Sequence, residues 1–122
     1  MNEEIKIVKT MSEKLILYKI ESINNDGDVV GHINYIKHGD PYDGLIEIYE
    51  FEVDVEFRGK GVAKEMFNYL IKSEELRKLF LLTHKDNIRA QKFYEKMGMI
   101  KETELKQHWH KDEDEFIYSR FF

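Results

Sequence analysis

A short turn rich in glycine and positive charge lies near the centre of the sequence. It reads Arg58-Gly59-Lys60-Gly61 and follows the apolar stretch that contains Val53 and Val55. After it, apolar residues fall at positions 62, 63, 66, 67, 70 and 71, the one-sided stripe of an amphipathic helix. Such a joint directs free backbone N–H groups and the positive end of the helix dipole at one place, and its glycines leave the backbone open to approach. The spacing is neither that of a P-loop nor that of a dinucleotide fingerprint, but it predicts a phosphate or pyrophosphate site over residues 58–63.

A second segment, residues 87–99, has the start and end signals of a helix. It follows the apolar run Leu79–Leu82, which is typical of a buried strand. Asp86 or Asn87 can cap the N-terminus of this helix, and Gly98 can end it. Phe93 and Tyr94 are adjacent within it, so we expect one of the two rings to point away from the face that the other occupies.

Together, and in this order, the two segments resemble the GCN5-related N-acetyltransferase (GNAT) superfamily. Its first motif is similar to Arg58, Gly61 and Ala63, and its second is similar to Asn87, Ala90, Phe93, Tyr94 and Gly98, with Met99 in place of the usual Phe. The resemblance is close over residues 45–99 and extends to the rest only by pattern. It implies one N-acetyltransferase domain over residues 1–122, with acetyl-CoA as cosubstrate. Since the chain has no cysteine, we expect the amine to attack the thioester directly in a ternary complex.

The resemblance also implies where the acyl donor binds. The pyrophosphate would lie on the N–H groups of Arg58, Gly59, Lys60, Gly61, Val62 and Ala63. The pantetheine arm would pair with strand backbone at Val53 and Val55, where an N–H group would polarise the acetyl carbonyl. Arg58 and Lys60 either add positive charge near the phosphates or are ordinary cations at a turn. Asn87 either contacts the pantetheine arm or only caps its helix.

Two residues are the candidates for proton transfer. Tyr94 matches the family tyrosine that protonates the leaving thiolate; the alternative is a ring packed in the core beside Phe93. Glu47 is similar in position to the glutamate that activates the amine in the histone-acetylating branch, commonly through water. Glu50 and Glu52 lie on the same expected strand and compete for this role. The alternative for Glu47 is a cross-strand ion pair on a solvated face.

The elements that would position these residues form an α/β (α+β) fold. We expect a mixed, mostly antiparallel sheet of six or seven strands and two main helices, at about residues 61–75 and 87–97. The expected strands cover residues 5–8, 15–23, 29–36, 45–55, 79–82, 100–105 and 115–122.

Two departures from a regular pattern bear on the site. Along residues 45–55 the apolar positions switch from even to odd between Ile48 and Tyr49, which predicts a β-bulge; the alternative is a strand buried on both faces. Family members usually carry one or two helices between their first two strands, where they form much of the acceptor pocket. Here only a few residues around Thr10 to Lys14 stand in that place. Either the chain is a reduced member, or a partner subunit, such as a second copy in a homodimer, supplies that wall.

Charge and composition narrow the partners. The chain has 24 acidic and 19 basic residues and a net charge of −5, which argues against nucleic-acid binding and favours cationic partners such as amines. No long apolar run or signal peptide appears, so we expect a cytoplasmic protein that does not bind membranes. His108 and His110, with Asp112 and Glu113, invite a metal interpretation. No second ligand cluster supports it, so we predict no metal.

Two classes of function remain. The first is an enzyme that acetylates a small amine, a protein lysine or a protein N-terminus. The second is a non-catalytic acyl-CoA-binding or protein-interaction module on the same fold. The presence of both Tyr94 and Glu47 favours the enzyme.

Overall fold

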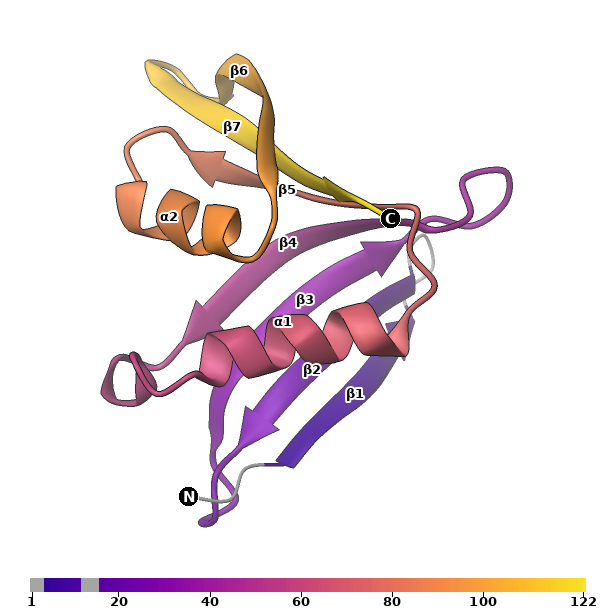
Figure 1. Ribbon diagram of the computed structural model, residues 1–122, viewed down its shortest axis with the longest axis vertical. Coiled ribbons are helices and arrows are strands. Elements are labelled where there is room, and N and C mark those ends of the chain that lie inside the picture. Colours follow the sequence, from indigo (N-terminus) through magenta and orange to yellow (C-terminus); the bar gives the residue numbers. More distant parts are fainter. Residues whose placement is uncertain (1–3, 12–15) are drawn as a thin grey trace.

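The computed structural model describes residues 4–11 and 16–122, which form one seven-stranded sheet with two α-helices (Figure 1). In chain order the elements are β1 (Glu4–Met11), β2 (Ile16–Ile23), β3 (Val29–Lys37), β4 (Leu45–Val53), the 3₁₀ turn η1 (Val55–Phe57), α1 (Val62–Ser73), β5 (Lys78–His84), α2 (Ile88–Lys96), β6 (Ile100–His110) and β7 (Glu113–Phe121). The strand order is β1-β2-β3-β4-β5-β7-β6, and all neighbours are antiparallel except β4 and β5. The predicted mixed, mostly antiparallel sheet is confirmed.

Both helices pack on the same face of the sheet. One row of cross-strand neighbours on that face comprises Tyr18, Tyr35, Ile48, Leu81 and Tyr118. The hydrophobic core joins this face to Met66, Phe67 and Leu70 of α1 and to Met97 and Met99 after α2. The helix α1 packs closely against β3 at Gly31, where an added Cβ would lie only 2.8 Å from the terminal methyl of Met66. Burial of this apolar stripe, rather than helix propensity, holds the helices in place.

The other face carries no helix in the part of the chain that the structure describes, and we call it the open face. Its adjacent row of cross-strand neighbours comprises Leu17, Ile36, Glu47, Phe80 and Ser119. Between β1 and β2, only residues 12–15 lie outside the described residues, and they include most of the segment expected to replace the family helices. Among the described residues, none of the helices has the length and apolar character needed to cross a membrane.

The predicted bulge in β4 is confirmed. Asn34 lies opposite Glu50, whereas the next residue of β3, Tyr35, lies opposite Ile48, so Tyr49 is the inserted residue. Just before the bulge, β4 pairs with β5 only from Leu45 opposite Lys78 to Ile48 opposite Leu81. Beyond that point the two strands diverge, as Figure 1 shows. The bulge and the separation together free one edge of the last residues of β4.

Several predicted boundaries are wrong. The strand β4 ends at Val53, and Val55 begins the 3₁₀ turn, because the chain must turn there to enter α1. The segment expected to be a polar loop over residues 106–114 is mostly the end of β6, which continues to His110 and pairs there with Glu113. Irregular backbone accommodates the polar residues in this hairpin: Gln107 has a φ of 45° and Asp112 a φ of 64°.

Candidate active site

A cavity of about 1050 Å³ lies between the end of β4, the joint before α1, and α2. Its walls bring together residues that are far apart in the sequence. Of the predicted donor-site residues it contains Val53, Val55, Arg58, Gly59, Gly61, Val62, Ala63 and Asn87, and of the predicted catalytic residues it contains Tyr94. Lys60 and Glu47 are not among its lining residues. The Lys60 ammonium instead lies 5.1 Å from the centre of the Phe57 ring, which is a cation–π contact.

The joint opens the N-terminus of α1 into this cavity. Gly59 and Gly61 have φ angles of 75° and 83°, a left-handed conformation that glycine adopts without a Cβ penalty. The first helical hydrogen bond runs from the Glu65 N–H to the Gly61 carbonyl, so the N–H groups of residues 62–64 have no partner within the helix. Arg58, Lys64, Arg89 and Lys96 also border the cavity. The site therefore combines free N–H donors, the positive end of a helix dipole and basic side chains, which together suit an anion.

The last residues of β4 present a second set of free backbone groups. The Asp54 N–H donates to the Val30 carbonyl at 2.8 Å, so this N–H faces β3, whereas the Asp54 carbonyl accepts from the Phe57 N–H of the 3₁₀ turn. By the alternation of an antiparallel ladder, the N–H and C=O of Phe51 and Val53 face the opposite edge, which β5 has left. Arg58 Nε donates to the Val53 carbonyl at 3.1 Å. The Phe51 N–H and C=O and the Val53 N–H remain as the free groups of this edge.

Phe51 is a site residue that the sequence analysis missed. The bulge at Tyr49 sets which residues of β4 face the free edge, and the apolar parity after it points to Phe51 and Val53 alike. Val55 lies on the 3₁₀ turn with its side chain 72% exposed, so the expectation that it continues the strand pairing is wrong. It remains part of the cavity wall.

Tyr94 lies half-buried between three aromatic rings. Its ring centre is 6.3 Å from that of Phe51, 6.2 Å from that of Tyr118 and 5.6 Å from that of Phe93. Burial raises the pKa of Tyr94 to about 12, so its hydroxyl is protonated at neutral pH. Its hydroxyl makes no hydrogen bond with the described residues, and it therefore keeps a free donor beside the cavity.

The expectation that Phe93 and Tyr94 diverge is wrong, because both rings pack against the core. Phe93 contacts Phe67 of α1, whereas Tyr94 contacts Tyr118 of β7. The ring centre of Phe51 lies 5.7 Å from that of Phe93 and 6.3 Å from that of Tyr94. The short helix α2 can bury two adjacent rings because it lies over the gap between β4 and β5 (Figure 1).

Asn87 caps α2. Its side-chain Oδ1 accepts a hydrogen bond from the Ala90 N–H at 3.1 Å, the standard geometry of a helix N-cap. At the other end Gly98 has a φ of 85°, as predicted for the helix stop. The capping role is therefore confirmed, and contact with a pantetheine arm stays a prediction.

Glu47 lies on the open face, between Ile36 and Phe80 of the neighbouring strands. Its side chain is half-buried and forms no ion pair with the described residues. The competitor Glu50 is paired with His32 at 2.5 Å. Glu47 and Tyr94 thus lie on opposite faces of the sheet. Glu47 is one residue before Ile48, where β4 and β5 separate, and Tyr94 lies beside the gap between these strands.

The histidines of the β6–β7 hairpin do not form a metal-binding group within the described residues. His108 and His110 are exposed, and Trp109 between them is 61% exposed, with its ring centre 4.6 Å from that of His108. Among the described residues, potential ligand atoms converge instead at His32, Glu50 and Glu52.

Comparison with known proteins identifies the family and the fold. The model of the acetyltransferase (GNAT) family matches residues 7–99. Among solved structures, *Arabidopsis thaliana* NAA60 with a bisubstrate analogue is 19% identical, with a TM-score of 0.73 over 86% of this chain and 75% of that one. *A. thaliana* Naa50 with the bisubstrate analogue CoA-Ac-MVNAL is 21% identical, with a TM-score of 0.76 over 85% of this chain and 72% of that one.

A third neighbour is the ribosomal-protein-S5-alanine acetyltransferase of *Vibrio fischeri*. It is 20% identical, with a TM-score of 0.75 over 86% of this chain, which spans 61% of that protein. At these identities the neighbours show the shared fold. No curated protein matches the sequence.

Proposed function

Because this chain belongs to the acetyltransferase (GNAT) family, we propose that it transfers an acetyl group from acetyl-CoA to a primary amine by direct attack in a ternary complex. One observation carries the proposal: the cavity wall combines the free N–H groups at the start of α1 with the free backbone edge of β4. A donor with a pyrophosphate at one end and an extended, amide-bearing arm needs these two sets of groups next to each other.

The pyrophosphate fits the joint. The N–H groups of residues 62–64 point into the cavity without an intrahelical partner, and Arg58 and Lys64 add positive charge. The pantetheine arm would then run along β4, where its amides can pair with Phe51 and Val53 as an added strand would. An N–H of this edge is placed to hydrogen-bond the acetyl oxygen as negative charge develops on it. Asn87 and Ala90 close the other side of the arm.

The reaction moves one acetyl group and one proton. The neutral amine nitrogen attacks the thioester carbonyl, a C–N bond forms, and the C–S bond breaks. The amine loses a proton, which we assign to Glu47 acting through water from the open face. The sulfur gains a proton from Tyr94, so coenzyme A leaves as the thiol. Exchange with solvent then carries the proton on Glu47 back to Tyr94.

The raised pKa of Tyr94 fits this role. A phenol with a pKa of about 12 is fully protonated at neutral pH, whereas an ordinary thiol has a pKa of about 8.5. Burial therefore keeps Tyr94 in the protonated form that can donate, and the same apolar surroundings disfavour a thiolate. A hydrogen bond from Tyr94 stabilises the departing sulfur before the proton moves.

The acceptor is an amine on a small molecule or on a protein. The neighbours include a ribosomal-protein-S5-alanine acetyltransferase and Naa50 with the bisubstrate analogue CoA-Ac-MVNAL, and they support a protein amine, such as an N-terminus, as one candidate. The net charge of −5 favours a cationic acceptor in either case.

A non-catalytic acyl-CoA-binding module is the second candidate, and the open face favours it. In family members helices form much of the acceptor pocket, and the described residues place none on this face. A chain of this kind would bind the donor through the same cavity without turning it over.

The deciding experiment measures thiol release from acetyl-CoA with a panel of amines and, in parallel, donor binding by calorimetry. The panel contains small monoamines, diamines, lysine peptides and peptides with free N-termini. We expect donor binding together with amine-dependent thiol release that Tyr94→Phe reduces. Donor binding with no thiol release from any amine would support the binding module, and no donor binding would contradict both proposals.

A further inference from the structure

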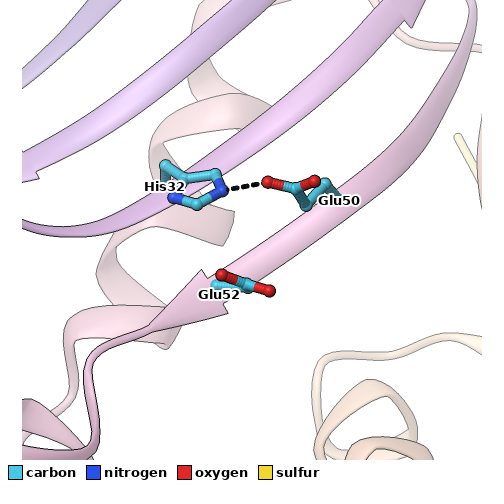
Figure 2. A group of neighbouring side chains, drawn as sticks. All are labelled: His32, Glu50 and Glu52. Atoms are coloured by element: carbon cyan, nitrogen blue, oxygen red, sulfur yellow. Dashed lines mark hydrogen bonds and ion pairs between the residues drawn. The ribbon is translucent and has the colours of Figure 1, made fainter.

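Three side chains with metal-ligating atoms converge on the open face (Figure 2). His32 comes from β3, and Glu50 and Glu52 come from β4 just after the bulge. His32 lies directly opposite Glu52 in the strand register, and Glu50 is two residues before Glu52, so all three side chains share one face. The His32 ring nitrogens and the two carboxylates provide one ligand atom each within 4.8 Å of one another.

The protein's own contacts leave part of this group unsatisfied. His32 Nε2 pairs with Glu50 Oε1 at 2.5 Å, and Asn34 Nδ2 donates to the same oxygen at 3.3 Å. Glu52 has no hydrogen bond or ion pair with the described residues, although its carboxylate lies beside a second one. The two neighbouring carboxylates repel each other, and a bound cation would relieve this repulsion.

A second observation points the same way. Asn34 Oδ1 is buried from solvent and accepts no hydrogen bond from the residues that the structure describes, while the amide nitrogen of the same side chain donates to Glu50. A buried carbonyl oxygen without a donor is costly, and native proteins rarely keep one without a role. The Asn34 amide contacts Glu50 through Nδ2, so the orphaned oxygen belongs to a residue beside this group, and an amide oxygen is itself a metal ligand.

We propose that His32, Glu50 and Glu52 bind a divalent transition-metal ion of the Zn²⁺ class. One imidazole nitrogen and two carboxylates are a donor set for zinc and its first-row neighbours, whereas Mg²⁺ and Ca²⁺ prefer oxygen ligands. The ion would replace the direct contact between His32 Nε2 and Glu50 Oε1. Three protein ligands leave a fourth position for water or for the Asn34 amide. This departs from the expectation, drawn from the sequence, of a protein without a metal site.

The three ligands lie next to the proposed acyl-donor site. Glu50 and Glu52 flank Phe51, whose backbone faces the gap between β4 and β5, and Glu52 also borders the donor cavity. An ion here would lie beside the proposed acyl-donor site but would use none of its anion-binding groups. The inference rests on the three ligands and Asn34 and stands whether or not the chain is a catalyst.

The test titrates the full chain, prepared without a histidine tag and treated with a chelator, with Zn²⁺ in a calorimeter and with Co²⁺ in a visible spectrometer. We expect one equivalent of Zn²⁺ to bind, Co²⁺ to give d–d absorption bands that Zn²⁺ abolishes, and Mg²⁺ to give no heat. The melting temperature should rise with Zn²⁺, because the ion binds the folded chain.

Variants locate the site. His32→Gln and Glu52→Gln should each lower Zn²⁺ affinity by at least about tenfold and remove the Co²⁺ bands, since even outer-shell changes have effects of that size. The matched control is His108→Gln combined with His110→Gln, which removes two exposed strand histidines and should leave binding unchanged. The metal-free melting temperature of each variant shows that it is folded. Absence of Zn²⁺ binding to the parent, or binding lost in the hairpin control and kept in the two site variants, would overturn the proposal.

Discussion

The two faces of the sheet differ at the point where β4 and β5 separate, beside the candidate active site. Two adjacent rows of cross-strand neighbours meet this point, one on each face. The row through Ile48 is covered by the helices and is apolar, and the row through Glu47 lies on the open face. The covered side holds the cavity, and its groups are mostly backbone N–H and C=O placed by glycines, a bulge and a helix start. The open face offers side chains instead, among them Glu47, Glu50 and His32.

The difference explains what each side can be expected to recognise. Backbone groups on the covered side suit one donor, because every acyl-CoA carries the same pyrophosphate and pantetheine arm. Side chains on the open face can vary without disturbing the fold, so they are suited to selecting the acceptor. The covered side should therefore respond to changes in backbone conformation and packing, and the open face to changes in charge.

The strongest test of the covered side is Gly61→Glu. This residue has a φ of 83° at the start of α1, so the variant adds a strained backbone and a carboxylate where an anion should bind. We expect acetyl-CoA affinity to fall by about 10³-fold or more, which corresponds to about 4 kcal/mol, measured by calorimetry.

Gly27→Glu is the matched control. Gly27 has a φ of 85° in the β2–β3 turn, and an added Cβ meets nothing within 4 Å there, as at Gly61. It carries the same strain in a turn that does not line the cavity, so it should lower stability and leave donor affinity unchanged. Equal donor affinity for both variants would contradict the placement of the pyrophosphate at residues 58–63.

The second test separates packing from chemistry at Tyr94. Tyr94→Phe keeps the three ring contacts and removes only the hydroxyl, so donor binding should hold while turnover falls by about 10²-fold, the lower range for a general acid. Steady-state kinetics at saturating substrates measures it, and Tyr69→Phe, a half-buried tyrosine on α1, is the control. Near-parental turnover would mean that water protonates the thiolate.

The third test crosses to the open face. An alkyl amine has a pKa of about 10.4 and is almost wholly protonated at neutral pH. Loss of the base should therefore lower turnover most at neutral pH. We expect Glu47→Gln to lower turnover by about tenfold at pH 7 and to recover in part at alkaline pH, where free amine is plentiful. Glu50→Gln and Glu52→Gln should have smaller effects. A pH profile identical to that of the parent would transfer the role to another group.

The sequence predicted the covered side far better than the open face, for a physical reason. Gly59, Gly61, Asn87 and Gly98 have local roles in a turn or a helix end, and such roles are visible in the order of residues. The bulge also appeared as a change of apolar parity at Tyr49. These features depend on neighbours in the chain.

The missed features depend on neighbours in space. His32 and Glu52 are brought together only by the register of β3 on β4, which the pattern of neither strand specifies. Phe51 becomes a site residue because the pairing of β4 with β5 ends at Ile48 opposite Leu81. The length of β6 was underestimated because its polar residues are typical of a loop, yet pairing with β7 makes them a strand.

The smallest effect is expected at Asn87, where the two sequence interpretations can be separated. Its Oδ1 accepts the Ala90 N–H, so Asn87→Ala should cost about 1 kcal/mol and lower the melting temperature by about 4 °C. Asn87→Ser keeps a capping oxygen but lacks the amide, so it should restore most of this stability. If Asn87 acts on the donor only by fixing the start of α2, acetyl-CoA affinity should fall slightly in the Ala variant and recover in the Ser variant. We expect donor affinity to recover in the Ser variant, because backbone groups on the covered side, rather than side chains, are expected to bind the donor. A loss of donor affinity in both variants, with stability restored only in Ser, would show that the amide itself contacts the donor and that side chains also select on this side.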